Sequence, residues 1–575
     1  MQSPEHQKSD MESSTKNPVE DTPQSKKNIL SRDWFLVLIL IALCIYLFVF
    51  KLGASTLWNF DEPIYGEVAK EMLKLGDWIT PHFNYQPWFD KPPLYMWLTA
   101  LTFRFFGWNE LTTRLWSALF GIGGVIVVYF LGKNIFNKRV GFLAGLVLAT
   151  SFQYIVQSRL GLLDVPLNFF ISLSLLFFCL GYKRTSRKRV YYLLFFASMG
   201  LATLTKGPIG ALLPCLIIGL YLLLAKEIKI LKEMGLLGGV IIYLAIAAPW
   251  YIIEFLLHGK EFVNSFFLLR HITRYLTSFE GHSGPPYYYI LVLIIGFLPW
   301  IGFLPYSFIH LVSLKSKWQS MEGKKTLFIL LWPAVIFIFF SFARSKLPGY
   351  IFPLYPSLAL CVGKFWSDSF ARVASLRKGT ILSFLLFFIF IVLIALILAA
   401  IFIGKIKLPA EYDPSARSLI LITVGLTTGT FISFLAFLKG KLSTSFGIIV
   451  GMMCFSTWML VTYTLPNTEI FKPTKFLAHK ITLVIRPEEK IGNYPASDRI
   501  AMSFDPSLIY YTDHPVKGID NEESLLHFLD SKERVYCLIE KKDYLEVKEK
   551  LRQIPFYILA ERGGKVLISN KKINR

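Results

Sequence analysis

The feature that most constrains this chain is a series of long apolar runs, of which residues 378–404 are a clear example. A helix rises about 1.5 Å per residue, so about 20 apolar residues are needed to cross a hydrocarbon layer of roughly 30 Å. The chain is 54% hydrophobic and only 17% charged, which excludes an ordinary globular domain in water. These runs therefore predict an α-helical polytopic membrane protein.

Thirteen apolar segments are long enough to be predicted as membrane spans. A fourteenth candidate at 93–106 has only about 14 residues and carries Arg104, which fits an interfacial or re-entrant segment better. The predicted spans are 33–50, 111–132, 139–157, 162–181, 189–205, 207–225, 233–256, 287–312, 325–343, 347–366, 378–404, 417–438 and 443–464.

The Lys and Arg residues between these spans predict which loops face the cytoplasm. If the N-terminus is cytoplasmic, the basic segments between the spans, for example 182–189 and 315–325, fall on the cytoplasmic side. Topological anchoring thus accounts for the formal charge of +22, and no nucleic-acid partner is expected. The large first loop 51–110, the loop 257–286 and everything after the last span are predicted on the outer face.

The two ends of the chain differ from the transmembrane part at 33–464. Residues 1–32 are polar and mixed in charge, which predicts a disordered cytoplasmic tail followed by a retained first span. Strand-like runs and amphipathic helical patterns at 465–575 predict a small α/β domain outside the membrane. Most of the six cysteines lie in apolar runs, so neither a disulfide framework nor a thiolate metal site is expected.

The segment "DEPIYGEVAKEM" at 61–72 places carboxylates directly after the first span. Its apolar residues recur at helical spacing and Pro63 stands in the first turn, which predicts a helix. Asp61 is then either the N-cap of this helix or a carboxylate with a chemical role. Glu67 and Glu71 have lysines at helical spacing, which predicts a solvated charged face.

Two further acidic positions stand out. "WFDKPPL" places Asp90 and Lys91 before a proline pair that holds the backbone extended, as in a rigid anion or metal site. A lysine extending to the membrane interface is the competing explanation. In "RLGLLDVP", Asp164 stands at the mouth of a span. A carboxylate that enters hydrocarbon costs up to about 2.5–3.5 kcal/mol, so this position suggests a function. Helix capping is the alternative there.

Basic and aromatic residues are predicted on the same outer face. Cations beside an acid stabilise charge that develops on a leaving phosphate oxygen. His271 lies among them, and together with a carboxylate such as Asp90 it is a candidate metal ligand. The alternative is that His271 is an ordinary hydrogen-bonded histidine. The basic and aromatic residues are Lys91, Lys206, Arg270, Arg274, Arg344, Lys346 and Tyr350.

The order of these motifs resembles the bacterial ArnT-like lipid A aminoarabinose transferases, which are related to the protein O-mannosyltransferases. The resemblance rests on "DEPIYGEVAKEMLKLGDWITPHFNYQPWFDKPPLYMWL", "RLGLLDVP", "LTKGP", "RHITRY" and "KLPGYIFPLYP", and covers essentially the whole chain. It implies a GT-C-type fold with about 13 transmembrane helices and a small C-terminal α/β periplasmic domain. It also implies a bacterial inner-membrane enzyme whose active site faces the periplasm.

The implied activity is transfer of 4-amino-4-deoxy-L-arabinose, or a similar sugar, from an undecaprenyl-phosphate donor to lipid A phosphate. By motif, Asp61 matches the family's first-loop catalytic carboxylate and Asp164 its second acidic position. The family has Glu where this chain has Asp90. The resemblance implies that Asp90 and His271 together hold a divalent metal ion, expected to be Zn with a structural role. No organic cofactor is expected. The residues expected to bind the lipid phosphate are Lys91, Arg274, Tyr350, Lys206 and Lys346.

The chemistry agrees with this resemblance. A phosphate leaving group is already anionic near neutral pH, so its departure requires cations and no general acid. Asp61 would act as general base toward a hydroxyl acceptor. Toward a phosphate acceptor, which is already an anion, it would orient an amino sugar or stabilise an oxocarbenium ion.

Other functions remain as alternatives. A polyprenyl-phosphate-sugar-dependent enzyme that modifies a protein or another glycan is the first. A secondary transporter or lipid flippase would also have many spans, but it is expected to keep ionisable residues near the bilayer midplane, where the long spans here are almost free of charge. A structural membrane protein with a solvated acidic loop is the third.

Overall fold

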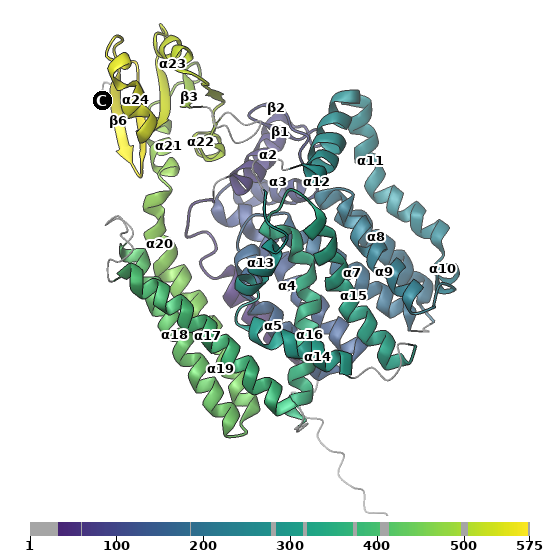
Figure 1. Ribbon diagram of the computed structural model, residues 1–575. Helices are drawn as coiled ribbons and strands as arrows, with labels where there is room; N and C mark the ends of the chain where they lie inside the picture. Colours follow the sequence, from purple (N-terminus) through teal and green to yellow (C-terminus); the bar gives the residue numbers. More distant parts are fainter. Residues whose placement is uncertain are drawn as a thin grey trace, which may run out of the picture.

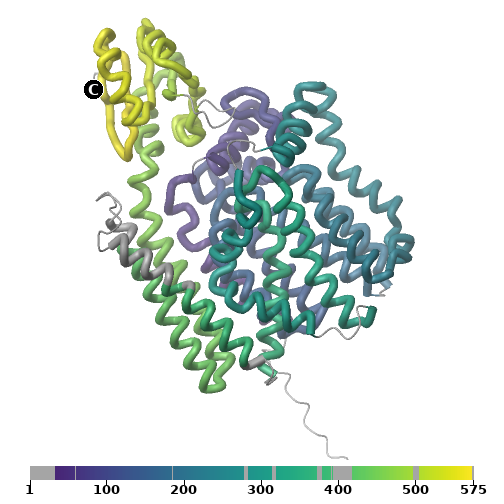
Figure 2. The backbone as a smooth tube through the Cα atoms, in the orientation of Figure 1, coloured from purple at the N-terminus to yellow at the C-terminus, as the bar shows by residue number. Residues whose placement is uncertain are grey.

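The computed structural model describes residues 33–58, 60–183, 186–277, 283–313, 319–371, 376–402, 413–495 and 504–572. The expected disordered tail at 1–32 lies outside the described residues. Figure 1 shows a body of long helices with a small mixed domain at one end, and Figure 2 traces the same arrangement as a tube.

Each of the thirteen predicted spans contains a helix or a pair of helices. Within the described ranges, six helices are long and apolar enough to cross a membrane, or up to eight if each of two bent pairs is one span. Thirteen crossings therefore stay a prediction. The helices of 18 or more residues, taken by length alone, are α4 (Glu110–Ile135), α7 (Asp164–Tyr182), α8 (Lys188–Lys206), α11 (Leu236–Phe262), α15 (Met321–Phe342), α17 (Leu376–Phe402), α18 (Asp413–Leu438) and α19 (Leu442–Met459).

Shorter elements complete the helical body. The first span is α1 (Asp33–Cys44) continued by η2 (Ile45–Val49), and α9 (Ile209–Leu224) is followed by α10 (Ile230–Glu233). The remaining ones are α5 (Lys138–Ala149), α6 (Phe152–Ser158), α13 (Tyr288–Gly296), η5 (Trp300–Phe303), α14 (Leu304–Ser313), η6 (Pro348–Leu354), α16 (Tyr355–Phe370), η8 (Leu460–Thr464), α20 (Leu465–Asn467) and η9 (Thr468–Phe471).

Two of the predicted spans are bent pairs rather than single straight helices. Helices α5 and α6 meet at 68°, where the Thr150 and Ser151 hydroxyls donate to carbonyls one turn earlier. Helix α13 and the segment Trp300–Ser313 meet at 112° around Pro299, which has no N–H to continue the helical ladder. These polar and proline positions explain why an apolar run alone did not predict the bends.

The largest buried cluster lies where α4, α5, α7, α8 and α16 pack together. Its fully buried side chains include Trp300, Trp332 and Trp366. Helices α17, α18 and α19 pack on one another along one side of the body, as Figure 1 shows. The helical body is therefore one continuous core with an adjoining three-helix layer.

Two segments outside the long spans lie at the same end of the molecule. The first contains α2 (Asp61–Leu75), the short strands β1 (His82–Phe83) and β2 (Gln86–Pro87), and α3 (Leu94–Phe106). The second begins at Gly259, whose φ of 52° suits a residue without a Cβ and bends α11 into η3 (Val263–Thr273) and α12 (Arg274–Leu276). Phe262 and Phe266 then pack against Phe89 of the first segment.

The C-terminal part forms a five-stranded mixed sheet with the strand order β4-β3-β5-β7-β6. Strands β4 and β5 pair parallel with β3, and β7 pairs antiparallel with β5 and β6. The elements are α21 (Thr474–Thr482), β3 (Lys490–Tyr494), α22 (Pro506–Thr512), β4 (Val516–Gly518), α23 (Glu522–Leu529), β5 (Val535–Glu540), α24 (Lys541–Leu551), β6 (Tyr557–Arg562) and β7 (Lys565–Ser569). We call this part the C-terminal domain.

The predicted solvated face of α2 is wrong. Glu67 and Glu71 are both fully buried, because α22 of the C-terminal domain packs over this side of α2. Lys70 Nζ lies 2.8 Å from Glu67 Oε2 and donates to the Tyr510 carbonyl at 2.6 Å. The helical spacing of glutamate and lysine on α2 predicts their pairing. It does not predict their burial, because the element that covers them lies more than 400 residues further along the chain.

Candidate functional site

A cavity of about 1530 Å³ opens between α2, the start of α7, the end of α8, η3–α12 and η6. It collects residues from segments that are far apart in the sequence, at the end of the body where α2 lies. Of the nine predicted site residues, eight line it: Asp61, Asp90, Lys91, Asp164, Lys206, His271, Arg274 and Tyr350. Arg270, which the sequence analysis named as a basic residue of this face, also lines the cavity.

Asp61 stands at the first position of α2 and is exposed to the cavity. The cap position belongs to Phe60, so the N-cap interpretation of Asp61 is wrong. Burial within the cavity walls raises the pKa of the Asp61 carboxyl, while Lys91 and Lys206 act in the opposite direction. The helix start also favours the ionised form, because the helix dipole is positive there.

Phe60 has φ 77° and ψ −86°, a conformation that a residue with a Cβ rarely adopts. Backbone strain of this kind costs on the order of 1–3 kcal/mol and persists only where the surroundings hold it. It turns the chain sharply just before the Asp61 carboxylate.

Glu62 holds the first turn of α2 from behind. Arg114 donates to both oxygens of the Glu62 carboxylate, at 2.8 and 2.9 Å, and both side chains are almost fully buried. Glu62 also accepts the backbone N–H groups of Trp58 and Gly161, at 2.7 and 2.6 Å. Such a bidentate, fully hydrogen-bonded ion pair fixes the position of the first turn of α2 more firmly than a single charge would.

Asp164 and Lys206 form an ion pair at one wall of the cavity, with Lys206 Nζ 2.6 Å from Asp164 Oδ1. The Asp164 carboxylate also rests against Gly349, where an added Cβ would lie 2.9 Å from Oδ2. Asp164 is the first residue of α7, so it faces the cavity from a helix start. The glycine of "KLPGY" thus leaves room for this carboxylate.

Tyr350 lies between two cations. Lys206 Nζ lies 5.8 Å from the centre of its ring and the Arg274 guanidinium carbon lies 5.9 Å from it. Cation–π attraction at these distances orients both side chains on the ring. Tyr350 therefore spaces Lys206 and Arg274 across the cavity, as expected for residues that together receive an anion.

Asp90 and Lys91 precede the proline pair that leads into α3. Burial lowers the pKa of Lys91 to about 8, although the neighbouring Asp90 acts in the other direction. The Asp90 carboxylate pairs with Arg270, whose Nε lies 2.6 Å from Oδ1. A lysine with a lowered pKa has been moved out of bulk water, which strengthens its attraction for an anion in the cavity.

The predicted metal site does not fit this arrangement. Asp90 is engaged by Arg270, and His271 Nδ1 lies 2.6 Å from the Phe266 carbonyl oxygen. No group of three or more His, Cys, Asp or Glu side chains suited to a metal occurs among the described residues. We therefore derive no step through a metal ion, and the Zn site stays a prediction.

Lys346 is the predicted site residue that does not line the cavity. Its ammonium donates to the Ser341 and Ala343 carbonyls at 2.8 and 2.7 Å, and lies 5.5 Å from the Tyr289 ring centre. It closes the turn between α15 and η6. The charge that looked available for a phosphate is used to satisfy backbone oxygens.

Sequence reasoning missed three contributions to this site. Tyr65 and Gln157 line the cavity beside Asp61 and Asp164, and nothing in their sequence context marked them. Arg114 carries a signal that was available, because an arginine inside an apolar span needs a buried partner. That partner is Glu62, within the acidic segment that was already singled out.

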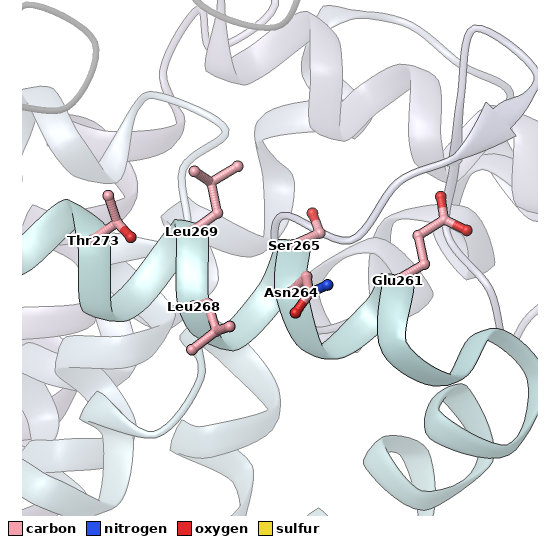
Figure 3. A pocket seen from close by; sticks show the side chains of 6 residues that line it. All are labelled: Glu261, Asn264, Ser265, Leu268, Leu269 and Thr273. Atoms are coloured by element: carbon pink, nitrogen blue, oxygen red, sulfur yellow. The ribbon is translucent and has the colours of Figure 1, made fainter.

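A second, shallower hollow of about 480 Å³ lies along η3 and is shown in Figure 3. All the side chains that line it come from one continuous helical stretch: Glu261, Asn264, Ser265, Leu268, Leu269 and Thr273. Since no second element within the described part of the chain brings charge or a carboxylate to it, the candidate site is the larger cavity.

Known proteins resemble this chain in sequence and in fold. Residues 90–253 match the family model described as dolichyl-phosphate-mannose-protein mannosyltransferase. The chain is 30% identical over 407 residues to the undecaprenyl phosphate-alpha-4-amino-4-deoxy-L-arabinose arabinosyl transferase 2 of Pseudomonas fluorescens (strain Pf0-1). That alignment covers 69% of this chain and 70% of the relative.

Solved structures show the same similarity over almost the full length. The crystal structure of ArnT from Cupriavidus metallidurans bound to undecaprenyl phosphate has a TM-score of 0.77 at 25% identity, covering 94% of this chain and 99% of that one. The oligosaccharyltransferase of Archaeoglobus fulgidus has a TM-score of 0.53 at 12% identity, covering 89% and 70%, and shares the fold alone.

Proposed function

This chain belongs to the family of the undecaprenyl phosphate-aminoarabinose arabinosyl transferases, and from that premise we propose which reaction its cavity performs. It transfers 4-amino-4-deoxy-L-arabinose, or a similar sugar, from an undecaprenyl-phosphate donor to a phosphate of lipid A. The protein is a glycosyltransferase of the bacterial inner membrane. With the thirteen crossings predicted from the sequence, the cavity and the C-terminal domain would face the periplasm, and the distribution of Lys and Arg supports this orientation.

The observation that carries the proposal is the convergence of two kinds of charge in one cavity. Asp61 and Asp164 line it together with Lys91, Lys206 and Arg274, although these residues come from four distant segments. At about 1530 Å³ the cavity exceeds the roughly 300–1,000 Å³ of ordinary small-molecule sites, as a lipid-linked sugar meeting a second lipid requires.

The reaction breaks the bond between the anomeric carbon of the sugar and the phosphate oxygen of the carrier. The electron pair of that bond leaves with the carrier, so undecaprenyl phosphate departs with one more negative charge. Lys91 and Arg274 are placed to receive that charge, and Tyr350 holds Arg274 at its distance from Lys206. Fixed cations in a site with little water stabilise such charge strongly.

The acceptor oxygen forms the new bond to the anomeric carbon. A lipid A phosphate already carries negative charge near neutral pH, so no base has to remove a proton from it. The Asp61 carboxylate then stabilises positive charge that develops on the sugar as the old bond breaks, and contacts its amino group. Asp164 keeps Lys206 in position through their 2.6 Å ion pair.

Reconstituted vesicles provide the direct test. The purified protein, undecaprenyl phosphate-linked aminoarabinose and lipid A are combined, and modified lipid A is measured by mass spectrometry. We expect a mass increase of one aminoarabinose residue with the parent protein and its loss with Asp61→Asn. The exposed Asp520→Asn, the same change outside the cavity, is the matched control.

Lipid A from cells with and without the gene gives an independent measurement. An unchanged lipid A together with a modified protein or another glycan would overturn lipid A as acceptor and keep the enzyme class. No transfer from any polyprenyl-phosphate sugar would overturn the proposed reaction.

A further inference from the structure

The peptide that leads into Asp61 is held by the C-terminal domain and by the η9 turn that leads into it. Glu469 accepts the Thr56 backbone N–H at 3.1 Å with one carboxylate oxygen and the Thr56 hydroxyl at 2.7 Å with the other. The Tyr511 hydroxyl accepts the Leu57 N–H at 2.9 Å. Lys472 donates to the Thr56 carbonyl at 3.2 Å and lies 4.0 Å from the Trp58 ring centre. Residues 56–58 are thus bound at successive backbone positions.

Helices α4 and α2 bind the same peptide. Arg114 donates to the Thr56 carbonyl at 2.9 Å, and Glu62 accepts the Trp58 N–H at 2.7 Å. Charged side chains bind backbone groups more strongly than neutral ones do. Two parts of the protein therefore hold residues 56–58 between them, just before the strained turn at Phe60.

The Tyr511 hydroxyl links the two parts. It donates to Glu110 Oε1 at 3.1 Å while it accepts from Leu57, and Lys475 pairs with the same Glu110 carboxylate. Glu110 is the first residue of α4, the helix that carries Arg114. Helices α22 and α21 therefore bind the start of the same helix, α4, that carries Arg114.

Helix α2 itself is packed just as closely against α22. A Cβ added at Gly66 would lie 2.8 Å from the Tyr510 ring, so no side chain fits between the two helices. Lys70, fully buried, pairs with Glu67 and lies 3.3 Å from Asp513 Oδ1 and 4.4 Å from the Tyr510 ring centre. The C-terminal domain cannot shift without moving α2 or leaving a charge buried without its partners.

We propose that the C-terminal domain and the η9 turn that leads into it are a positioning element of the site. Through Tyr511 and Glu469 they hold the strained turn at Phe60 and so set the place of the Asp61 carboxylate. Neither residue lines the cavity, so each acts through Asp61. The proposal rests on the proposed function only for the identity of the reaction. The positions of residues 56–61 are open to measurement without any substrate.

The test uses the full-length protein with Glu469→Gln, Tyr511→Phe and the double variant. Each change keeps the shape of the side chain and removes a charge or a hydroxyl. Because displacement of a reacting group by about 1 Å costs up to 100-fold, we expect kcat to fall about 10-fold in each single variant. The affinity for undecaprenyl phosphate alone should stay within about twofold, since the cations that bind it are not touched.

Matched changes at exposed positions of the same domain serve as controls. Glu561→Gln and Tyr557→Phe repeat the two substitutions on β6, and both residues are exposed. They should leave kcat and binding as in the parent protein. Thermal unfolding of all variants separates loss of position from loss of fold.

Hydrogen exchange supplies the readout that does not depend on activity. We expect backbone amides in the peptide around 56–66 to exchange at least 10-fold faster in the double variant, with amides of α7 unchanged. Parent-like exchange in this peptide overturns the proposal, as does a kcat loss no larger than that of the controls. If the parent protein transfers no sugar, the exchange result still decides about the positioning.

Discussion

The two ends of α2 carry carboxylates whose pKa is raised by burial, yet their surroundings give them different roles. At the N-terminal end Asp61 opens onto the cavity and faces Lys91 and Lys206 across it. At the C-terminal end Glu71 is closed off under the C-terminal domain and accepts the Tyr85 N–H at 2.9 Å. A shifted pKa therefore marks a site of chemistry only where the group can also reach a substrate.

The largest expected effect separates the two ends directly. Asp61→Asn should lower kcat about 1,000-fold, because losing one fixed group that stabilises developing charge costs about 10²–10³ in kcat. Glu71→Gln should change kcat by less than about threefold, since it lies outside the cavity. Steady-state transfer assays measure both. An equal loss of kcat in the two variants would show that the two ends of α2 do not have different roles.

The cation opposite Asp61 comes next. Lys91→Met should lower kcat about 100-fold, because a fixed donor at a developing charge is worth about 10²–10³. It should also weaken binding of undecaprenyl phosphate, measured by isothermal titration. Lys346→Met is the matched control, since Lys346 bonds to backbone carbonyls outside the cavity. Comparable loss of carrier binding in that variant would return Lys346 to the phosphate-binding group.

The pH dependence of kcat/KM should show both groups of the cavity. Asp61 must be ionised and its pKa is raised, so activity rises with pH through a value above the ordinary range of a carboxyl. Lys91 must be charged and its pKa is lowered to about 8, so activity falls as pH rises through about 8. Lys91→Arg keeps its charge and should move the falling limb to higher pH. A falling limb unmoved in Lys91→Arg would assign it to another group.

The smallest effect concerns stability at the closed end of α2. Burial raises the pKa of Glu71 from 4.5 to about 8, with the nearby Glu67 adding to the shift. A raised carboxyl pKa contributes stability that is complete below pH about 4.5 and is lost as pH rises through about 8. Glu71→Gln should therefore reduce the fall in Tm between pH 6 and pH 9 by a few degrees, measured by calorimetry. The exposed Glu523→Gln should leave it unchanged.

Local patterns in the sequence were enough to predict the helical class and most of the cavity. Apolar length locates the helices, and residues such as Asp164 were conspicuous because a charge next to an apolar span has a high cost. The bends at Thr150 and Pro299 arise at hydroxyl-bearing residues and at a proline, and the length of an apolar run does not predict them. The similarity to a known family suggested roles for these residues, and the structure brings the residues together in one cavity.

The remaining errors share one physical cause, which is contact with a distant partner. Glu67 and Glu71 looked solvated because α22 follows them by more than 400 residues. The position of Lys346 outside the cavity was not predictable either, because the carbonyls that accept its hydrogen bonds belong to a turn that no sequence motif marks. The strain at Phe60 depends on groups on both sides of it, and an isolated stretch of sequence carries no sign of it.

The contacts of Thr56 and Leu57 have a consequence for biosynthesis. Glu469 and Tyr511 follow them by 413 and 454 residues, so the ribosome makes the first helices long before the groups that bind this peptide exist. Insertion into the bilayer can proceed while the reaction centre is still incomplete. On the proposed positioning role, the peptide before Asp61 therefore reaches its final place only after the last part of the chain has been made.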